Sequence, residues 1–248
     1  MSTTWLLWLA LTLLTGNPLG ALVAVVVVLW LADRFTFRLL PGPVRAVRRW
    51  RRAGELRRGL GVNPHDRRAR LELADLVLAR HPAEAAALAR ANVEAGDEDV
   101  PTLYLLGAGL ARSGQADAAE RVLAAAKERE PGFRLGELDL ELGRLRLRRG
   151  DFAGAREALE RLVQARPGTV EGRWLLSRAL AGVGDRAGVV RMRDEGWAEY
   201  CALPGFRRRE ERRYAWRLRP ERGALAVVGV AAALTAAGAL LLTLVGFR

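Results

Sequence analysis

The chain contains two long runs of apolar and small residues without a single charge, one near each end of the sequence. The first run spans residues 5–32 and the second spans 223–247. Each is longer than the roughly 20 apolar residues that a helix needs to cross the hydrocarbon core of a bilayer. The pattern predicts an N-terminal transmembrane segment within 1–33 and a C-terminal transmembrane helix within 223–248.

A cleaved secretory signal is the alternative interpretation of the first run. Such a signal begins with basic residues, and the opening stretch MSTTWLLW contains neither Lys nor Arg. We therefore predict a permanent anchor. Asn17 and Pro18 interrupt the run, and the sequence leaves open one kinked span or a short interfacial helix followed by a span.

Between the two runs, apolar residues recur at the spacing of amphipathic helices, and the pattern itself repeats along the chain. A shift of 36 residues brings the stretch 103–131 onto the next stretch at six special positions. The matched pairs are Leu106 with Leu142, Gly107 with Gly143, Gly114 with Gly150, Ala119 with Ala155, Leu123 with Leu159, and Pro131 with Pro167.

Each matched position has a physical reason. Gly107 and Ala119 are small, which lets two antiparallel helices approach to roughly 8 to 10 Å. Gly114 stands where the first helix has to end and the chain to reverse. Pro131 ends the second helix, because proline cannot continue it. The pattern predicts a repeated helix-turn-helix unit.

This spacing resembles the tetratricopeptide repeat, a helix-turn-helix unit of about 34 residues. The resemblance implies an all-α helical solenoid over 67–203, with two clear repeats and a degraded repeat on either side. In the upstream copy His81 and Pro82 replace the turn glycine, and in the downstream copy Arg193 stands where a large apolar residue is expected. A weaker match to the repeat pattern is expected toward both ends, because terminal repeats are exposed to solvent on one face.

The formal net charge of +12 is concentrated beside the two uncharged runs. Residues 33–70 carry twelve Arg against three acids, and residues 205–222 carry eight Arg against three acids, whereas 71–204 has a small excess of acids. Positive charge next to a transmembrane helix is retained on the cytoplasmic side. Both flanks therefore predict a cytoplasmic middle and external termini. A polybasic patch that binds nucleic acid is the alternative.

Two basic segments connect the solenoid to the predicted spans. The segment 34–66 contains Val47, Trp50 and Leu56 among many arginines, which fits either an amphipathic helix at the membrane surface or a solvated linker helix. The segment 204–222 contains an aromatic and basic stretch, which we interpret as an interfacial belt before the second span. The belt residues are Tyr214, Ala215, Trp216 and Leu218.

The sequence shows no pattern typical of an enzyme. Glu137, Asp139 and Glu141 alternate, which on a helix places them on different faces instead of pairing them for acid-base catalysis. His65 has no identifiable nucleophile partner, and Cys201, the single cysteine, has no partner for a disulfide or a metal site. We expect no catalytic residue, cofactor or metal.

By resemblance, the first helix of each repeat lines a concave groove that binds partner proteins. The residues at groove-facing positions are Tyr104, Arg112, Arg144, Arg148, Trp174 and Arg178. Arginine pairs with carboxylates and aromatic rings serve as anchors, so an acidic or carboxylate-ended peptide suits this set. The alternative is that the arginines are solvated or paired with Glu137 and Glu141.

Together these observations predict a non-catalytic scaffold or adaptor tethered to a bacterial inner membrane at both ends. The bacterial assignment comes from the basic residues, which are arginines except Lys127, a bias typical of GC-rich genomes. The alternative function is a structural or lipid-associated membrane protein whose basic segments hold anionic lipids. The partner, the pathway and the oligomeric state do not follow from the sequence.

Overall fold

The computed structural model describes residues 43–225 and 228. The first uncharged run, with its predicted kink at Pro18, and nearly all of the second run lie outside the described residues. Within the described ranges, no helix is both long and apolar enough to cross a membrane.

The described residues are helical, with no strand among them. The helices are α3 (Pro43–Val62), α4 (Arg67–Val77), α5 (Pro82–Glu94), α6 (Val100–Arg112), α7 (Ala116–Arg129), the 3-10 turn η1 (Phe133–Leu135), α8 (Glu137–Arg149), α9 (Phe152–Ala165), α10 (Val170–Gly182), α11 (Arg186–Ala202) and α12 (Gly205–Leu218). The chain divides into two compact units. One unit is Pro43–Leu203, which holds α3 to α11, and the other combines Met1–Gly42 with Pro204–Arg248, in which α12 is described.

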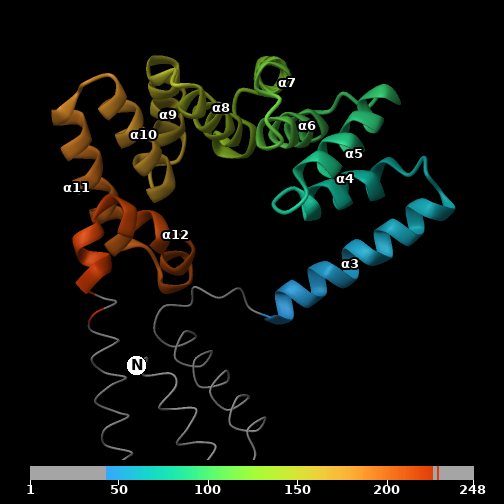
Figure 1. The fold of residues 1–248 in the computed structure, drawn as a ribbon, viewed down its shortest axis with the longest axis horizontal. Coiled ribbons are helices and arrows are strands. Elements are labelled where there is room, and N and C mark those ends of the chain that lie inside the picture. The colour runs from blue at the N-terminus through green and yellow to red at the C-terminus, as the bar shows by residue number, and fades with distance from the viewer. Residues whose placement is uncertain (1–42, 226–227, 229–248) are drawn as a thin grey trace, which may run out of the picture. The chain divides into compact units, whose positions relative to one another are not determined.

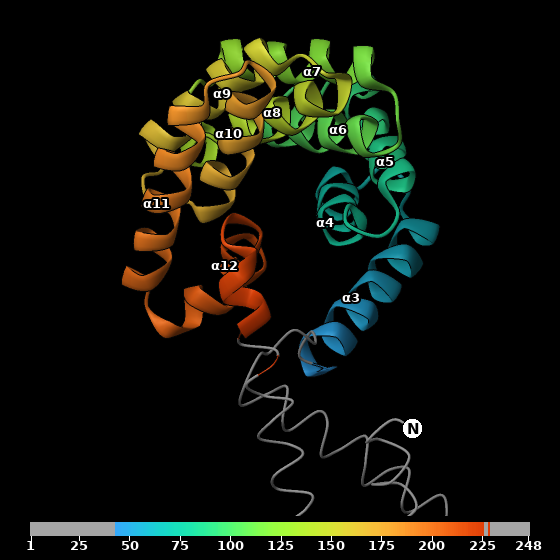
Figure 2. The ribbon, with the colours of Figure 1, turned by 60° about the vertical axis from the view of Figure 1, so that its left-hand side comes forward.

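Within Pro43–Leu203 the helices form four consecutive antiparallel pairs, namely α4 with α5, α6 with α7, α8 with α9, and α10 with α11. Each pair packs on the next, as α5 does on α6 and α9 on α10. The pairs follow one another in an arc, with the first helix of each pair on the inner side (Figures 1 and 2). This unit is therefore an all-α helical solenoid.

In three of the four helix pairs the turn is made by a glycine in the left-handed region. Gly114, Gly150 and Gly184 have φ angles of 90°, 78° and 82°, which a residue with a Cβ adopts only at a cost. Asp151 then begins α9 by accepting a hydrogen bond at 2.9 Å from the Gly154 amide. Gln115, which precedes α7 at the corresponding turn, makes no such side-chain bond.

Close contact between paired helices depends on the two repeated glycines of the first helices. A Cβ added to Gly107 would lie 2.6 Å from Cγ of Leu123, and one added to Gly143 would lie 2.6 Å from Cγ of Leu159. Both leucines are fully buried. The small residue in one helix thus receives the large side chain of the other.

The terminal helix pairs form although their sequences depart from the repeat. At the upstream turn, α4 ends at Val77 and Pro82 begins α5, where its missing amide hydrogen costs nothing. At the downstream end the buried apolar residue of α11 is Met192, one position before the half-buried Arg193. A one-residue shift of the apolar position therefore preserves the core there.

The compact unit begins at Pro43, earlier than the predicted solenoid boundary at residue 67. Ala53 and Leu56 of α3 are buried in the same apolar core as Leu73 of α4. Val47 and Trp50 are exposed instead. The three apolar residues of the sequence pattern thus lie on two different faces of α3, and only one face packs on the solenoid.

In α12 the structure differs from the predicted interfacial belt. Tyr214, Ala215 and Leu218 are buried and Trp216 is half-buried, whereas a belt at a membrane surface presents such side chains on the outside. Arg213 donates a hydrogen bond of 2.7 Å to the Tyr214 hydroxyl. The exposed side chains of this helix are mostly its arginines.

Candidate functional site

The six residues predicted to line a groove lie on the first helices of three consecutive pairs. Tyr104 and Arg112 belong to α6, Arg144 and Arg148 to α8, and Trp174 and Arg178 to α10. The solenoid thus places them along the inner side of its arc, but it does not make them equivalent. Three of them take part in contacts between the helix pairs, Arg148 and Arg178 are exposed, and Trp174 is half-buried.

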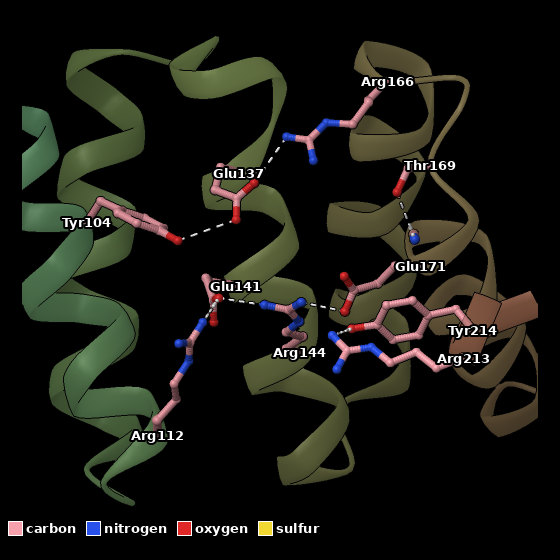
Figure 3. A network of polar contacts seen from close by, with 11 residues as sticks. Tyr104, Arg112, Glu137, Glu141, Arg144, Arg166, Thr169, Glu171, Arg213 and Tyr214 are labelled. Atoms are coloured by element: carbon pink, nitrogen blue, oxygen red, sulfur yellow. Dashed lines mark hydrogen bonds and ion pairs between the residues drawn. The ribbon is translucent and has the colours of Figure 1, made fainter. Parts of the chain in front are cut away.

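A buried carboxylate joins two of the predicted arginines. The Glu141 side chain on α8 is 1 % exposed, and its Oε1 accepts hydrogen bonds of 2.6 Å from Arg112 of α6 and from Arg144 of its own helix. Arg144 also pairs with Glu171 of α10. Figure 3 shows this chain of alternating charges running across α6, α8 and α10.

The ion pairs of Glu141 show whether Arg112 and Arg144 are groups for binding a ligand or are paired within the protein. Burying a carboxylate in a weakly polar environment is costly unless cations and hydrogen bonds compensate it. Both guanidinium groups supply that compensation, and about three quarters of each arginine side chain is covered. These arginines are therefore paired within the protein, which was the alternative to their role as ligand groups.

Tyr104 also lies in the interior of the solenoid. It is buried, and its hydroxyl donates a 3.3 Å hydrogen bond to Glu137, which also pairs at 3.1 Å with Arg166 (Figure 3). Burial, together with the negative charge of Glu137, raises the pKa of Tyr104 above its ordinary value. The phenol therefore stays protonated and serves as a hydrogen-bond donor.

The ring of Tyr104 lies beside the connection between the second and third helix pairs. Its centroid is 5.5 Å from that of Phe133, and the Arg134 guanidinium is 5.5 Å from the Tyr104 centroid. Arg134 and Leu135 have positive φ angles of 45° and 55°, which is uncommon for residues other than glycine. The two tilted rings and the Arg134 guanidinium thus pack together at this strained turn.

The remaining three predicted residues present both charge and apolar surface to the outside. Arg148 and Arg178 are exposed, and Trp174 is half-buried. The Arg178 guanidinium lies 5.4 Å from the centroid of the Trp174 ring, within the range of a cation-π contact. Neither Arg148 nor Arg178 forms an ion pair with any described residue, so their charge is available to a partner.

Several residues of this face did not emerge from sequence reasoning. Glu171, Arg166 and Arg134 were not singled out, although Glu171 stands three residues before Trp174 and thus shares a helix face with it. Glu137 and Glu141 were considered as partners for arginine in general. The contact of Glu141 with Arg144 follows from their i, i+3 spacing, but nothing in the sequence indicates the contacts of Glu141 with Arg112 and of Glu137 with Arg166, because these join residues nearly one repeat apart.

The predicted absence of enzyme chemistry concerns His65, Cys201 and the three alternating acids of α8. His65 is exposed in the turn before α4, and Cys201 is exposed near the end of α11. Asp139 pairs with Lys127 and, at 3.0 Å, with Arg161. Over residues 43–225 and 228, no group of three or more His, Cys, Asp or Glu side chains is arranged to hold a metal ion.

No protein-family model and no curated protein matches this sequence. Solved structures do match. A crystal structure of MamA is similar with a TM-score of 0.53 and 19 % identity over 59 % of this chain and 85 % of that chain. The MamA AMB-1 structure matches with a TM-score of 0.54 and 16 % identity over 64 % of this chain and 94 % of the other.

A third similar structure is that of YrrB, described as a TPR protein with an unusual peptide-binding site. It has a TM-score of 0.51 and 17 % identity over 63 % of this chain and 80 % of that chain. At these identities the likeness concerns the fold.

Proposed function

We propose that this chain, a tetratricopeptide-repeat protein, is a non-catalytic scaffold that binds partner proteins on the inner face of its solenoid at a membrane surface. The fold supports the first half of this proposal, since structures with the same fold include a peptide-binding protein. Repeat arrays of this kind offer an extended concave surface for binding.

The observation that carries the proposal is the division of the inner face into paired and unpaired charges. Arg112 and Arg144 are paired with buried Glu141, whereas Arg148 and Arg178 form no ion pair with a described residue, and Arg178 lies over the ring of half-buried Trp174. A partner therefore meets two available positive charges, one of them beside an aromatic ring. An acidic segment with an apolar residue fits this arrangement best.

Attachment to the membrane is the second half of the proposal. Two uncharged runs of spanning length, each with its arginines on the side of the solenoid, support a two-span protein of the bacterial cytoplasmic membrane. A topology reporter fused after Arg248 is expected outside the cytoplasm, and one inserted near Gly96 inside it. Both reporters on the same side would refute the two-span arrangement.

The binding face is tested with full-length protein in native membranes. We expect Trp174→Ala and Arg148→Glu to abolish crosslinking of a bound protein that the wild-type chain retains. Helix content and membrane insertion should not change in Arg148→Glu, because Arg148 is exposed. Trp174 packs against the apolar core, so the thermal stability of Trp174→Ala is measured beside its binding. The Arg148→Glu effect should weaken at high salt, which screens surface charges over roughly 8 Å or less.

Arg121→Glu is the matched control, because Arg121 is exposed on α7, a second helix of a pair, and forms no ion pair with a described residue. It changes the charge by the same amount on the outer side of the arc. Loss of the partner with Arg121→Glu and its retention with the two inner-face variants would place binding on the outer side and refute the proposal.

A further inference from the structure

The outer face of α3 carries apolar and cationic side chains that the solenoid does not use. Ala53 and Leu56 point into the core, whereas Val47 and Trp50 lie outside it, with exposed fractions of 52 % and 73 %. Arg51 follows Val47 by four residues and therefore shares its outward face. An exposed tryptophan between arginines is unusual for a surface that meets only water.

The arginines of α3 fall into two groups according to their partners. Arg52 makes two hydrogen bonds, of 2.6 and 2.8 Å, to Glu72 of α4, and Arg57 makes two of 3.0 Å to Glu84 of α5. These two-point contacts fix α3 on the solenoid and thereby determine which of its sides faces outward. The arginines without an ion pair to a described residue are Arg48, Arg49, Arg51 and Arg58.

The charge of this face is almost uncompensated. Glu55 is the single acidic residue in α3, and it faces Arg52 at 3.6 Å. Clustered arginines near the surface of a membrane with anionic lipids each strengthen its attachment, and tryptophan prefers the boundary between headgroups and acyl chains. The combination on α3 matches that boundary in both charge and polarity.

We propose that the outer face of α3 docks on an anionic lipid bilayer, with Trp50 and Val47 in the headgroup region and Arg48, Arg51 and Arg58 on the lipid phosphates. This deepens the proposed function and rests on its membrane tether for one argument. Only residues 33–42 separate the first uncharged run from α3, and ten residues reach about 35 Å at most. A helix so tethered stays within reach of the headgroups.

The docking would fix the orientation of the solenoid toward the membrane. Because Arg52 and Arg57 hold α3 against α4 and α5, a bilayer that binds the outer face of α3 also positions the first helix pairs. The arginines that bind lipid and those that hold the solenoid are different residues. They can therefore be changed separately.

The test uses the full chain with Cys201→Ser, and a spin label is attached to Val47→Cys. The protein is reconstituted either in neutral phosphatidylcholine vesicles or in vesicles that contain about 30 mol % phosphatidylglycerol, which resemble anionic membranes. Collisions of the label with oxygen and with a water-soluble nickel chelate report its depth. In anionic vesicles we expect a label that oxygen reaches and nickel does not. In neutral vesicles nickel should reach it.

Replacement of Arg48, Arg51 and Arg58 by glutamine should reverse the protection in anionic vesicles. Each arginine is worth about fivefold in attachment to an anionic surface, so the three together weaken docking about 100-fold. The matched control replaces Arg121, Arg186 and Arg191, which are exposed on α7 and α11 and have no ion pair with a described residue. Equal loss of protection in this control would refute a specific role for α3.

Flotation after alkaline carbonate treatment separates this inference from the membrane tether. A chain that floats after carbonate while its α3 label stays accessible to nickel in anionic vesicles overturns the docking and leaves the tether intact. A chain that carbonate releases from all vesicles, but whose label is protected by anionic vesicles before that treatment, overturns the tether and supports the docking. Protection of the label by an RNA oligonucleotide and not by anionic vesicles would also overturn the docking.

Discussion

Replacement of Gly143 by alanine measures how closely the two helices of a repeat approach each other. A Cβ on this residue would lie 2.6 Å from both Cγ and Cδ2 of Leu159 and 3.2 Å from its Cδ1. Leu159 is fully buried in a close-packed core, so its side chain has no empty space into which it can turn. The added methyl group must separate α8 from α9 or force Leu159 into a poor rotamer.

Two opposing contributions set the expected change in the free energy of unfolding. Alanine is better than glycine inside a helix by about 1 kcal/mol. Overpacking a filled core costs roughly 1 to 3 kcal/mol, and a value near the middle is appropriate because all three contacts are with one side chain. Gly143→Ala should therefore lower the unfolding free energy by about 1 kcal/mol, which corresponds to a Tm about 2 to 4 °C lower for a chain of this size. Gly143→Leu should lower it further.

The assay is thermal unfolding of the full chain in detergent, followed by far-ultraviolet circular dichroism. Gly54→Ala is the control, because Gly54 lies in the middle of α3 and a Cβ there meets nothing within 4 Å. That variant should raise Tm, since it gains helix propensity without a clash. An equal rise of Tm for Gly143→Ala and Gly54→Ala would mean that Gly143 and Leu159 do not touch, and the reasoning would fail.

Three further predictions concern charges and strain. Glu141→Gln should lower the unfolding free energy by about 2 kcal/mol, less than for a fully buried ion pair because both arginine partners are partly exposed; an unchanged denaturant midpoint would show that the bridge contributes nothing. Leu135→Gly should raise Tm. Leu135 has a φ of 55°, so glycine relieves backbone strain of about 1 to 2 kcal/mol, and the leucine side chain is 64 % exposed, so its loss costs little packing. A lower Tm would contradict this. Arg52 lowers the pKa of Glu72, so their contact stabilises α3 above the ordinary glutamate pKa and is lost as pH falls through the lowered value; the protection of α3 amides from hydrogen exchange, relative to the intrinsic rate at each pH, should fall there, and in Glu72→Gln this fall should be absent.

The elements that depend on local backbone chemistry could be predicted from the sequence. Gly114 and Gly150 have to adopt left-handed φ angles, and Pro131 and Pro167 cannot continue a helix, whatever surrounds them. Because these constraints act within a few residues, their spacing alone defined the helix pairs. The likeness to solved tetratricopeptide-repeat structures confirms that interpretation.

Whether an individual arginine is paired or exposed could not be predicted in the same way. Arg112 and Arg148 occupy corresponding positions of successive repeats, yet one is bound to buried Glu141 and the other is exposed. The difference arises from the next helix pair, because only Arg112 is followed by a repeat that places a carboxylate within reach. The sequence also did not show that α3 has one packed side and one exposed side. Ala53 and Leu56 are only two residues, too few to form a recognisable apolar stripe among the many charged residues of this helix.

The chain of charges through Glu141 has a consequence for how the solenoid opens. Most contacts in a repeat array join immediate neighbours, so the array can unfold from its ends one pair at a time. Arg112, Glu141, Arg144 and Glu171 link three successive pairs through shared atoms, and the loss of α10 and α11 would leave Arg144 with a changed set of partners. The last three pairs, α6 to α11, should therefore exchange their amide hydrogens as one cooperative block, while α4 and α5 fray independently.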